Sequence, residues 1–286
     1  MMQNTVQEII SFSGLGVHSA VFAQVSILPA AVDAGIIFMH KNFLTEPIVV
    51  GAVVPLDAMH ATVLRQKSWT LSTVEHLVAA LRMAGVDNAV VMVEGGYEIP
   101  ILDGSAAPFF HAICRAGLVN QGMRKKFLMP RQAISFDERG GKKIYLKPLE
   151  DDTLSGSLFC DYEAVFNHYA LGSKKMTGLI DQQLFKQKIA PARTFGFLEQ
   201  LPFLRSHQLA MASSLGNTLV FNADEAINDH RIVDEWLSHK VLDFIGDLGL
   251  LPHPFTGYVE AAQTGHAFNR RIVEHYLTHP ESWIVV

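Results

Sequence analysis

The chain has 286 residues, of which 49% are hydrophobic, and its formal net charge at pH 7 is −5. This length and composition predict one large buried core or two medium ones. The acidic balance, without a dense stripe of Lys and Arg, argues against nucleic-acid binding, and the lack of an apolar run of about 18 residues argues against a transmembrane segment.

The first half of the chain is typical of strands followed by helices. The sequence does not open with a basic stretch before an apolar one, so we expect no signal peptide and a cytoplasmic protein. Strand composition marks residues 21–30, 34–40 and 89–94. Helical patterns follow at residues 72–84 and 105–116, and Ser72 has the capping-box spacing to Glu75 at the start of the first of them.

The second half repeats this order after the polar stretch 119–127, which we interpret as a domain boundary. The predicted domains are residues 1–124 and residues 125–286, the second with an inserted apolar segment near 195–222. Strands are predicted at 132–138, 142–149, 153–162, 192–197, 218–222 and 255–263, and helices at 181–188, 232–251 and 265–279. The sequence therefore predicts an α+β protein with two halves of similar layout, each a sheet packed against helices.

One helix carries a polar stripe that could bind a metal ion. In "EWLSHKVLDFIGDL", His239, Asp243 and Asp247 follow one another at four-residue steps, so their side chains share one face of the helix. An imidazole and a carboxylate at this spacing can reach the same cation. A His–Asp pair with this spacing is also often only a surface hydrogen bond, so the stripe alone leaves both interpretations open.

A second stretch, "STVEHLVAAL", contains an adjacent Glu75 and His76. Glu75 has a plain interpretation as the partner of Ser72 in a helix cap, and His76 as a partly buried histidine. However, catalytic zinc commonly takes three protein ligands and leaves a position for water. His76, His239 and Asp243 would supply such a set, with Glu75 beside it as a candidate general base.

His266 stands on a glycine turn in "TGHAFN", where reactive side chains are common. A histidine with no role at the start of a helix is an equally good interpretation of that position. Other catalytic motifs are missing from the sequence: it has no HExxH, no GxSxG and no GxGxxG.

Taken together, "STVEHLVAAL", "EIPILDGSAAPF", "ARTFGF", "HKVLDFIGDL" and "GHAFN" resemble the zinc-dependent UDP-3-O-acyl-N-acetylglucosamine deacetylases of lipid A biosynthesis in Gram-negative bacteria. The opening "FSGLGVHSA" is similar to that family as well, and the resemblance runs in order from about residue 11 to residue 271. It implies two α+β domains with the active site between them. It also implies an acylated UDP-N-acetylglucosamine substrate and a bound Zn²⁺, for which Fe²⁺ could substitute.

The resemblance also implies a role for each matching residue. His76, His239 and Asp243 would bind zinc, and Glu75 would activate a water molecule. His266, oriented by Asp247, would stabilise the oxyanion and protonate the leaving amine. The remaining roles are these: Thr194 would stabilise the tetrahedral intermediate, Phe195 and Lys240 would contact the sugar nucleotide, and His18 would lie near the substrate.

The chain departs from the family pattern at two positions that bear on substrate choice. Gln263 stands where a lysine is expected, and Ser238 where a basic residue is expected before the ligand histidine. Two alternatives therefore stay open: a related zinc amidohydrolase acting on another N-acyl sugar, and a non-catalytic protein that binds a sugar nucleotide or lipid precursor. The segment 195–222 is either a groove for the acyl chain or a core helix. We expect a monomer that works in the cytoplasm, near the inner membrane.

Overall fold

A computed structural model describes residues 1–151 and 156–286 of the chain. Each half contains a five-stranded mixed sheet. The N-terminal sheet has the order β2-β3-β8-β4-β5, with only β4 and β8 running parallel. Its strands are β2 (Ile10–Leu15), β3 (Phe22–Pro29), β4 (Ile36–His40), β5 (Ile48–Val49) and β8 (Ala89–Gly95).

The C-terminal sheet repeats this arrangement. Its order is β11-β12-β17-β13-β14, and again only the central pair, β13 and β17, is parallel. In both sheets the central strand comes last along the chain of the five and follows a helix that packs in the middle of the molecule, so the two halves share one topology. The strands are β11 (Ile134–Glu138), β12 (Lys142–Lys147), β13 (Leu158–Phe166), β14 (Gly172–Leu179) and β17 (Gly257–Ala262). The predicted α+β class with two similar halves is confirmed.

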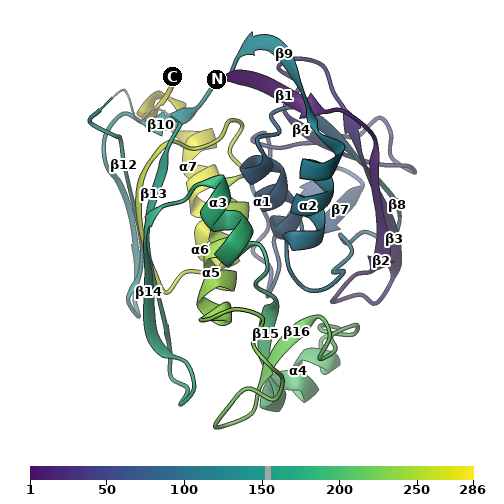
Figure 1. The fold of residues 1–286 in the computed structure, drawn as a ribbon, viewed down its shortest axis with the longest axis vertical. Helices are drawn as coiled ribbons and strands as arrows, with labels where there is room; N and C mark the ends of the chain where they lie inside the picture. Colours follow the sequence, from purple (N-terminus) through teal and green to yellow (C-terminus); the bar gives the residue numbers. More distant parts are fainter. Residues whose placement is uncertain (152–155) are drawn as a thin grey trace.

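Apart from the short helix at residues 201–206, the helices lie between the two sheets, which form the outer sides of the molecule (Figure 1). α5 (Glu235–Leu248) is the central helix, and every residue of it except Lys240 is buried. Its polar stripe is therefore as deeply enclosed as its apolar face. The other helical segments are α1 (Glu75–Ala84), α2 (Ala107–Ala116), α3 (Gln182–Leu184), the π-helical turn Phe185–Ile189, α6 (His266–Asn269) and α7 (Arg271–Thr278).

Short paired strands complete the fold. The segment 194–221 projects from the end of the molecule opposite the termini (Figure 1). It contains β15 (Thr194–Phe197), the 3₁₀ turn Leu198–Gln200, α4 (Leu201–Ser206) and β16 (Thr218–Phe221), and β15 pairs parallel with β16.

The remaining short strands in the described part of the chain form three further pairs. They are β1 (Met2–Val6) with β9 (Leu118–Arg124), β6 (Val63–Gln66) with β7 (Trp69–Ser72), and β10 (Leu128–Pro130) with β18 (Trp283–Val285), which follows the 3₁₀ turn Pro280–Ser282. The domain boundary at residues 124/125, directly after β9, stays a prediction.

Two local expectations differ from the structure, and one of two open alternatives is excluded. Ser72 does not cap α1: it ends β7, and its backbone is bonded to the 97–99 segment, so α1 begins only at Glu75. α4 has no buried side chain, which rules out a core helix there. The predicted strand 153–162 begins at Leu158, while residues 152–155 lie outside the described part of the chain.

The described residues contain no helix that is long and apolar enough to cross a lipid bilayer.

Candidate active site

The site forms where α1 packs against α5. Thr73, with a φ of 58°, turns the chain sharply from β7 into α1, which places Glu75 and His76 in the helix's first turn. Gly246 of α5 lies directly against the backbone of Glu75, and a Cβ atom there would overlap the Glu75 carbonyl. A glycine at this point therefore allows the two helices to approach closely enough for the side chains of both to meet.

His76, His239 and Asp243 meet as a group that could hold a metal ion. One ligand atom from each lies within 4.8 Å of the other two. The Asp243 Oδ1 atom is 3.2 Å from His239 Nε2 and 3.7 Å from His76 Nε2. Tetrahedral ligand atoms about 2.1 Å from a zinc ion stand roughly 3.4 Å apart, so the spacing fits a shared ion.

The protonation states of these groups also suit a cation. Burial lowers the pKa of His239 to about 4, so its imidazole is neutral at pH 7 and has a free lone pair. Its Nδ1–H donates to the Ala192 carbonyl at 3.2 Å, which leaves Nε2 for a ligand bond. Burial opposes ionisation of Asp243, but His239 and Lys240 hold its pKa well below the usual range. Two imidazoles and one carboxylate are a common donor set for catalytic zinc.

Glu75 and His266 flank this trio on the side of the cavity. His266 Nε2 is 3.7 Å from Glu75 Oε1 and 3.9 Å from Asp243 Oδ2. His266 Nδ1–H donates to Asp247 Oδ2 at 2.8 Å, so Asp247 orients the ring. Burial alone would lower the pKa of His266, but the Asp247 and Glu75 carboxylates outweigh it and raise the pKa to about 10. Burial raises the pKa of Glu75.

The ten residues to which the resemblance assigns a role lie at or beside one cavity of about 660 Å³. Nine of them line it, and Asp247 stands behind His266. Phe195 packs edge-on against the His239 ring at 6.1 Å between centroids. The Lys240 ammonium donates to Asp243 Oδ2 at 2.9 Å. The nine lining residues are His18, Glu75, His76, Thr194, Phe195, His239, Lys240, Asp243 and His266.

His18 is held in the cavity wall by contacts from three segments. Glu98 accepts hydrogen bonds from the His18 backbone N–H at 2.9 Å and from the Ser19 hydroxyl at 2.6 Å. The His18 ring contacts the His60 carbonyl through Nε2 and the Ala210 N–H through Nδ1. With both ring nitrogens occupied, His18 contributes to the shape of the cavity.

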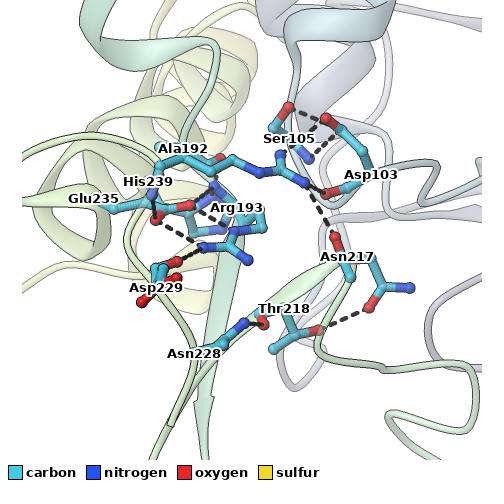
Figure 2. A network of polar contacts seen from close by, with 12 residues as sticks. Asp103, Ser105, Ala192, Arg193, Asn217, Thr218, Asn228, Asp229, Glu235 and His239 are labelled. Carbon is cyan, nitrogen blue, oxygen red and sulfur yellow. Dashed lines mark hydrogen bonds and ion pairs between the residues drawn. The ribbon is translucent and has the colours of Figure 1, made fainter. Parts of the chain in front are cut away.

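A buried ion pair fixes the strand that carries Thr194. Arg193 donates to Glu235 through its backbone N–H at 3.0 Å and through Nε at 2.8 Å. Its Nη2 reaches the Asp229 carbonyl at 2.6 Å, and Figure 2 shows Arg193 between Glu235 and Asp229, with His239 close by. The next residue, Thr194, donates its N–H to the Gly104 carbonyl at 2.8 Å. The network thus ties β15 to both halves of the molecule.

Replacing Arg193 by methionine should destabilise the protein by about 3–5 kcal/mol, because it leaves the fully buried Glu235 carboxylate without its partner. Denaturant unfolding of the metal-free variant and parent measures this difference. Lys41→Met, which breaks the exposed pair with Glu94, is the matched control and should change stability little. Equal effects in the two variants would contradict a structural role for the buried pair.

Two contributors to the site were missed in the sequence. Arg193 stood inside the "ARTFGF" motif and could have been suspected as a buried arginine in need of an acidic partner. Thr62 contacts Glu75, Asp247 and His266, yet nothing in the local sequence marks it, because its partners come from residues 13 to 204 positions away.

Comparison with known proteins agrees with this geometry. Residues 3–278 match the model of the LpxC family, described as UDP-3-O-acyl N-acetylglycosamine deacetylase. Proteins named UDP-3-O-acyl-N-acetylglucosamine deacetylase are similar over nearly their whole length. The protein from Phenylobacterium zucineum is 36% identical over 100% of this chain and 96% of its own. Those from Vibrio parahaemolyticus and Chromobacterium violaceum are 34% and 33% identical, over 98% and 99% of this chain and 92% of their own. A match of this extent to the family model, with relatives aligned from end to end, shows that the chain belongs to the LpxC family.

Proposed function

We propose that this protein is a zinc-dependent deacetylase that hydrolyses the N-acetyl group of UDP-3-O-(3-hydroxyacyl)-N-acetylglucosamine, the committed step of lipid A biosynthesis. The observation that carries the proposal is the meeting of a possible metal-binding trio with Glu75 and His266 in one cavity. A protein that only binds a sugar nucleotide has no need of a buried carboxylate and a buried imidazole at that point. The family membership and the names of the relatives support the same reaction.

His76, His239 and Asp243 would hold the metal. When bound, zinc supplies a Lewis acid that makes water a strong nucleophile near neutral pH and polarises a carbonyl group. The same two nitrogens and one oxygen would also accept Fe²⁺. Metal analysis of the purified protein distinguishes the two ions.

Glu75 and His266 divide the proton transfers between them. Glu75 takes a proton from the attacking water, for which its carboxyl must be ionised. His266 is the acid: its cation meets the charge that develops on the carbonyl oxygen and then gives a proton to the departing amine. Asp247 keeps the His266 ring in place through Nδ1, so that Nε2 faces the cavity. The Thr194 hydroxyl, on the cavity wall, would stabilise the tetrahedral intermediate.

The rest of the cavity suits an amphipathic substrate. Phe195 and Lys240 would contact the sugar nucleotide, and His18 would lie near it. Beyond Phe195, the lining continues onto the projecting segment through Phe197, Leu204 and Ala210. An apolar wall next to a polar reaction centre is what an acylated sugar requires, and we assign this wall to the acyl chain.

The decisive experiment measures acetate release from the acylated UDP-N-acetylglucosamine by the zinc-loaded protein. We expect turnover that a chelator abolishes and added zinc restores. UDP-N-acetylglucosamine without the acyl chain is the matched control and should react far more slowly. Equal rates with both substrates would indicate that the true substrate is another N-acyl sugar. Gln263 in the cavity wall would then be the residue to test. No chelator-sensitive turnover of either substrate would overturn the proposal.

We expect a bell-shaped dependence of kcat/KM on pH. Activity rises as pH increases through the pKa of Glu75, because only the carboxylate accepts a proton, and burial moves this limb above the ordinary glutamate range. Activity falls again as pH increases through the pKa of His266, because only its cation donates, and that pKa of about 10 is raised from the ordinary value. A bound cation would shift both limbs to lower pH.

Variants separate the two limbs in the same measurement. The residual activity of a Glu75 variant should lack the acidic limb, and that of a His266 variant the basic limb. A rate that stays flat across the neutral and alkaline range in the parent would contradict the two-residue scheme.

The cytoplasmic location near the inner membrane and the monomeric state stay predictions from the sequence.

A further inference from the structure

Thr62 contacts Glu75, Asp247 and His266, although none of the roles assigned above includes it. It lies just before β6, its residue is only 2% exposed, and it contacts the site through both its main chain and its side chain. The backbone N–H donates to Glu75 Oε2 at 3.2 Å. The side-chain Oγ1 is 2.5 Å from Asp247 Oδ1 and 3.0 Å from His266 Nδ1.

The side-chain contacts have only one consistent set of donors. The Asp247 carboxylate can only accept, so the single hydroxyl proton of Thr62 goes to Asp247 Oδ1. The Thr62 oxygen then turns its lone pairs to His266, whose Nδ1–H lies between Thr62 Oγ1 and Asp247 Oδ2. Asn269 donates to the same Oδ2 at 2.8 Å. Thr62 therefore fixes the rotation of the carboxylate and the plane of the imidazole together.

The main-chain contact fixes the other reacting group. Because the Thr62 N–H holds Glu75 Oε2, the second carboxylate oxygen, Oε1, is the one that faces His266 Nε2 at 3.7 Å. One residue thus sets the position of the base through its backbone and of the acid through its hydroxyl. A catalytic group displaced by about 1 Å can lose a factor of about 10² in rate.

We propose that Thr62 is a positioning residue that aligns Glu75 and His266 across the cavity for their two proton transfers. The catalytic part of this inference rests on the proposed function. The geometric part, that Thr62 sets the environment of His266 Nδ1–H, stands without it.

The kinetic test compares Thr62→Val with Thr62→Ser. Valine keeps the shape and the backbone N–H but removes the hydroxyl, and we expect kcat to fall by about 10–10² with KM nearly unchanged. Serine keeps the hydroxyl and should restore most of kcat. Combining Thr62→Val with Asp247→Asn should cost less than the product of the two single effects, because both act on His266. A serine variant as slow as the valine variant, or a valine variant as fast as the parent, would overturn the proposal.

A second measurement does not depend on turnover. The Nδ1–H proton of His266 should give a downfield ¹H NMR signal, identified by its loss in His266→Gln. We expect Thr62→Val to shift or broaden this signal and Thr62→Ser to preserve it. Thr256→Val is the matched control, because it removes another buried threonine hydroxyl, bonded to the Ser157 carbonyl, and should leave the signal unchanged.

The two measurements separate the two claims. A parent without deacetylase activity would end the proposed function, and the NMR comparison would still decide the role of Thr62. A His266 signal that is the same in the parent and in Thr62→Val would overturn that role even in an active enzyme.

Discussion

Replacing Glu75 by glutamine should lower kcat by about 10²–10⁴, the range that general acid–base catalysis typically contributes. Glutamine has nearly the same shape, and its carbonyl oxygen can still accept the hydrogen bond from the Thr62 backbone. It cannot take a proton from water. Because Glu75 is not one of the three residues that would hold the metal, the zinc content of the variant should match that of the parent.

The control for this prediction is the same substitution at an exposed site. Glu94→Gln on β8 alters an exposed carboxylate that pairs with Lys41 and should leave kcat unchanged. Substrate binding to Glu75→Gln should stay close to that of the parent, since the loss concerns the transition state alone. If Glu75→Gln turns over at the rate of the parent with full zinc occupancy, Glu75 is not the base.

The residues of the site could be predicted because its chemistry is concentrated in short motifs. A four-residue step places His239 and Asp243 on one face of a helix wherever that helix lies. That this face would meet His76 does not follow from spacing alone. It depends on the packing of α1 against α5, which the close approach at Gly246 permits. The resemblance to a family, carried by several ordered motifs, supplied that long-range information.

The sequence was misleading where a local pattern had two physical meanings. Ser72 and Glu75 have the spacing of a capping box, but the backbone of Ser72 is already bonded within a bridge to the 97–99 segment, and Glu75 points to His266 instead. The spacing of His239 and Asp243 was equally compatible with a hydrogen bond on the protein surface, whereas in the structure α1 of the first half packs against α5 and the polar stripe is buried. Thr62 could not be found at all, because a lone threonine acquires its role only from partners that are distant in sequence.

Replacing His76 by alanine should abolish stable zinc binding and, with it, turnover. Residues that merely orient metal ligands contribute factors of about 10–100 to metal affinity, so removal of a ligand itself should cost more than about 100-fold. The remaining pair, His239 and Asp243, comes from a single helix and offers only two of the three protein ligands usual for catalytic zinc. Metal analysis after dialysis should give one zinc per chain for the parent and far less for the variant.

Thermal unfolding provides a readout of the same loss that is independent of catalysis. Zinc at 1,000 times its Kd stabilises the folded parent by about 4 kcal/mol, so the Tm of the parent should rise on zinc addition and that of His76→Ala should not. His40→Ala is the matched control: His40 is a fully buried histidine that packs on Tyr97 and Trp69, away from the trio. Its removal should lower the Tm yet preserve the response to zinc. A zinc-dependent rise in Tm that is as large in His76→Ala as in the parent would place the metal elsewhere, and the roles of Glu75 and His266 would have to be assigned around that other position.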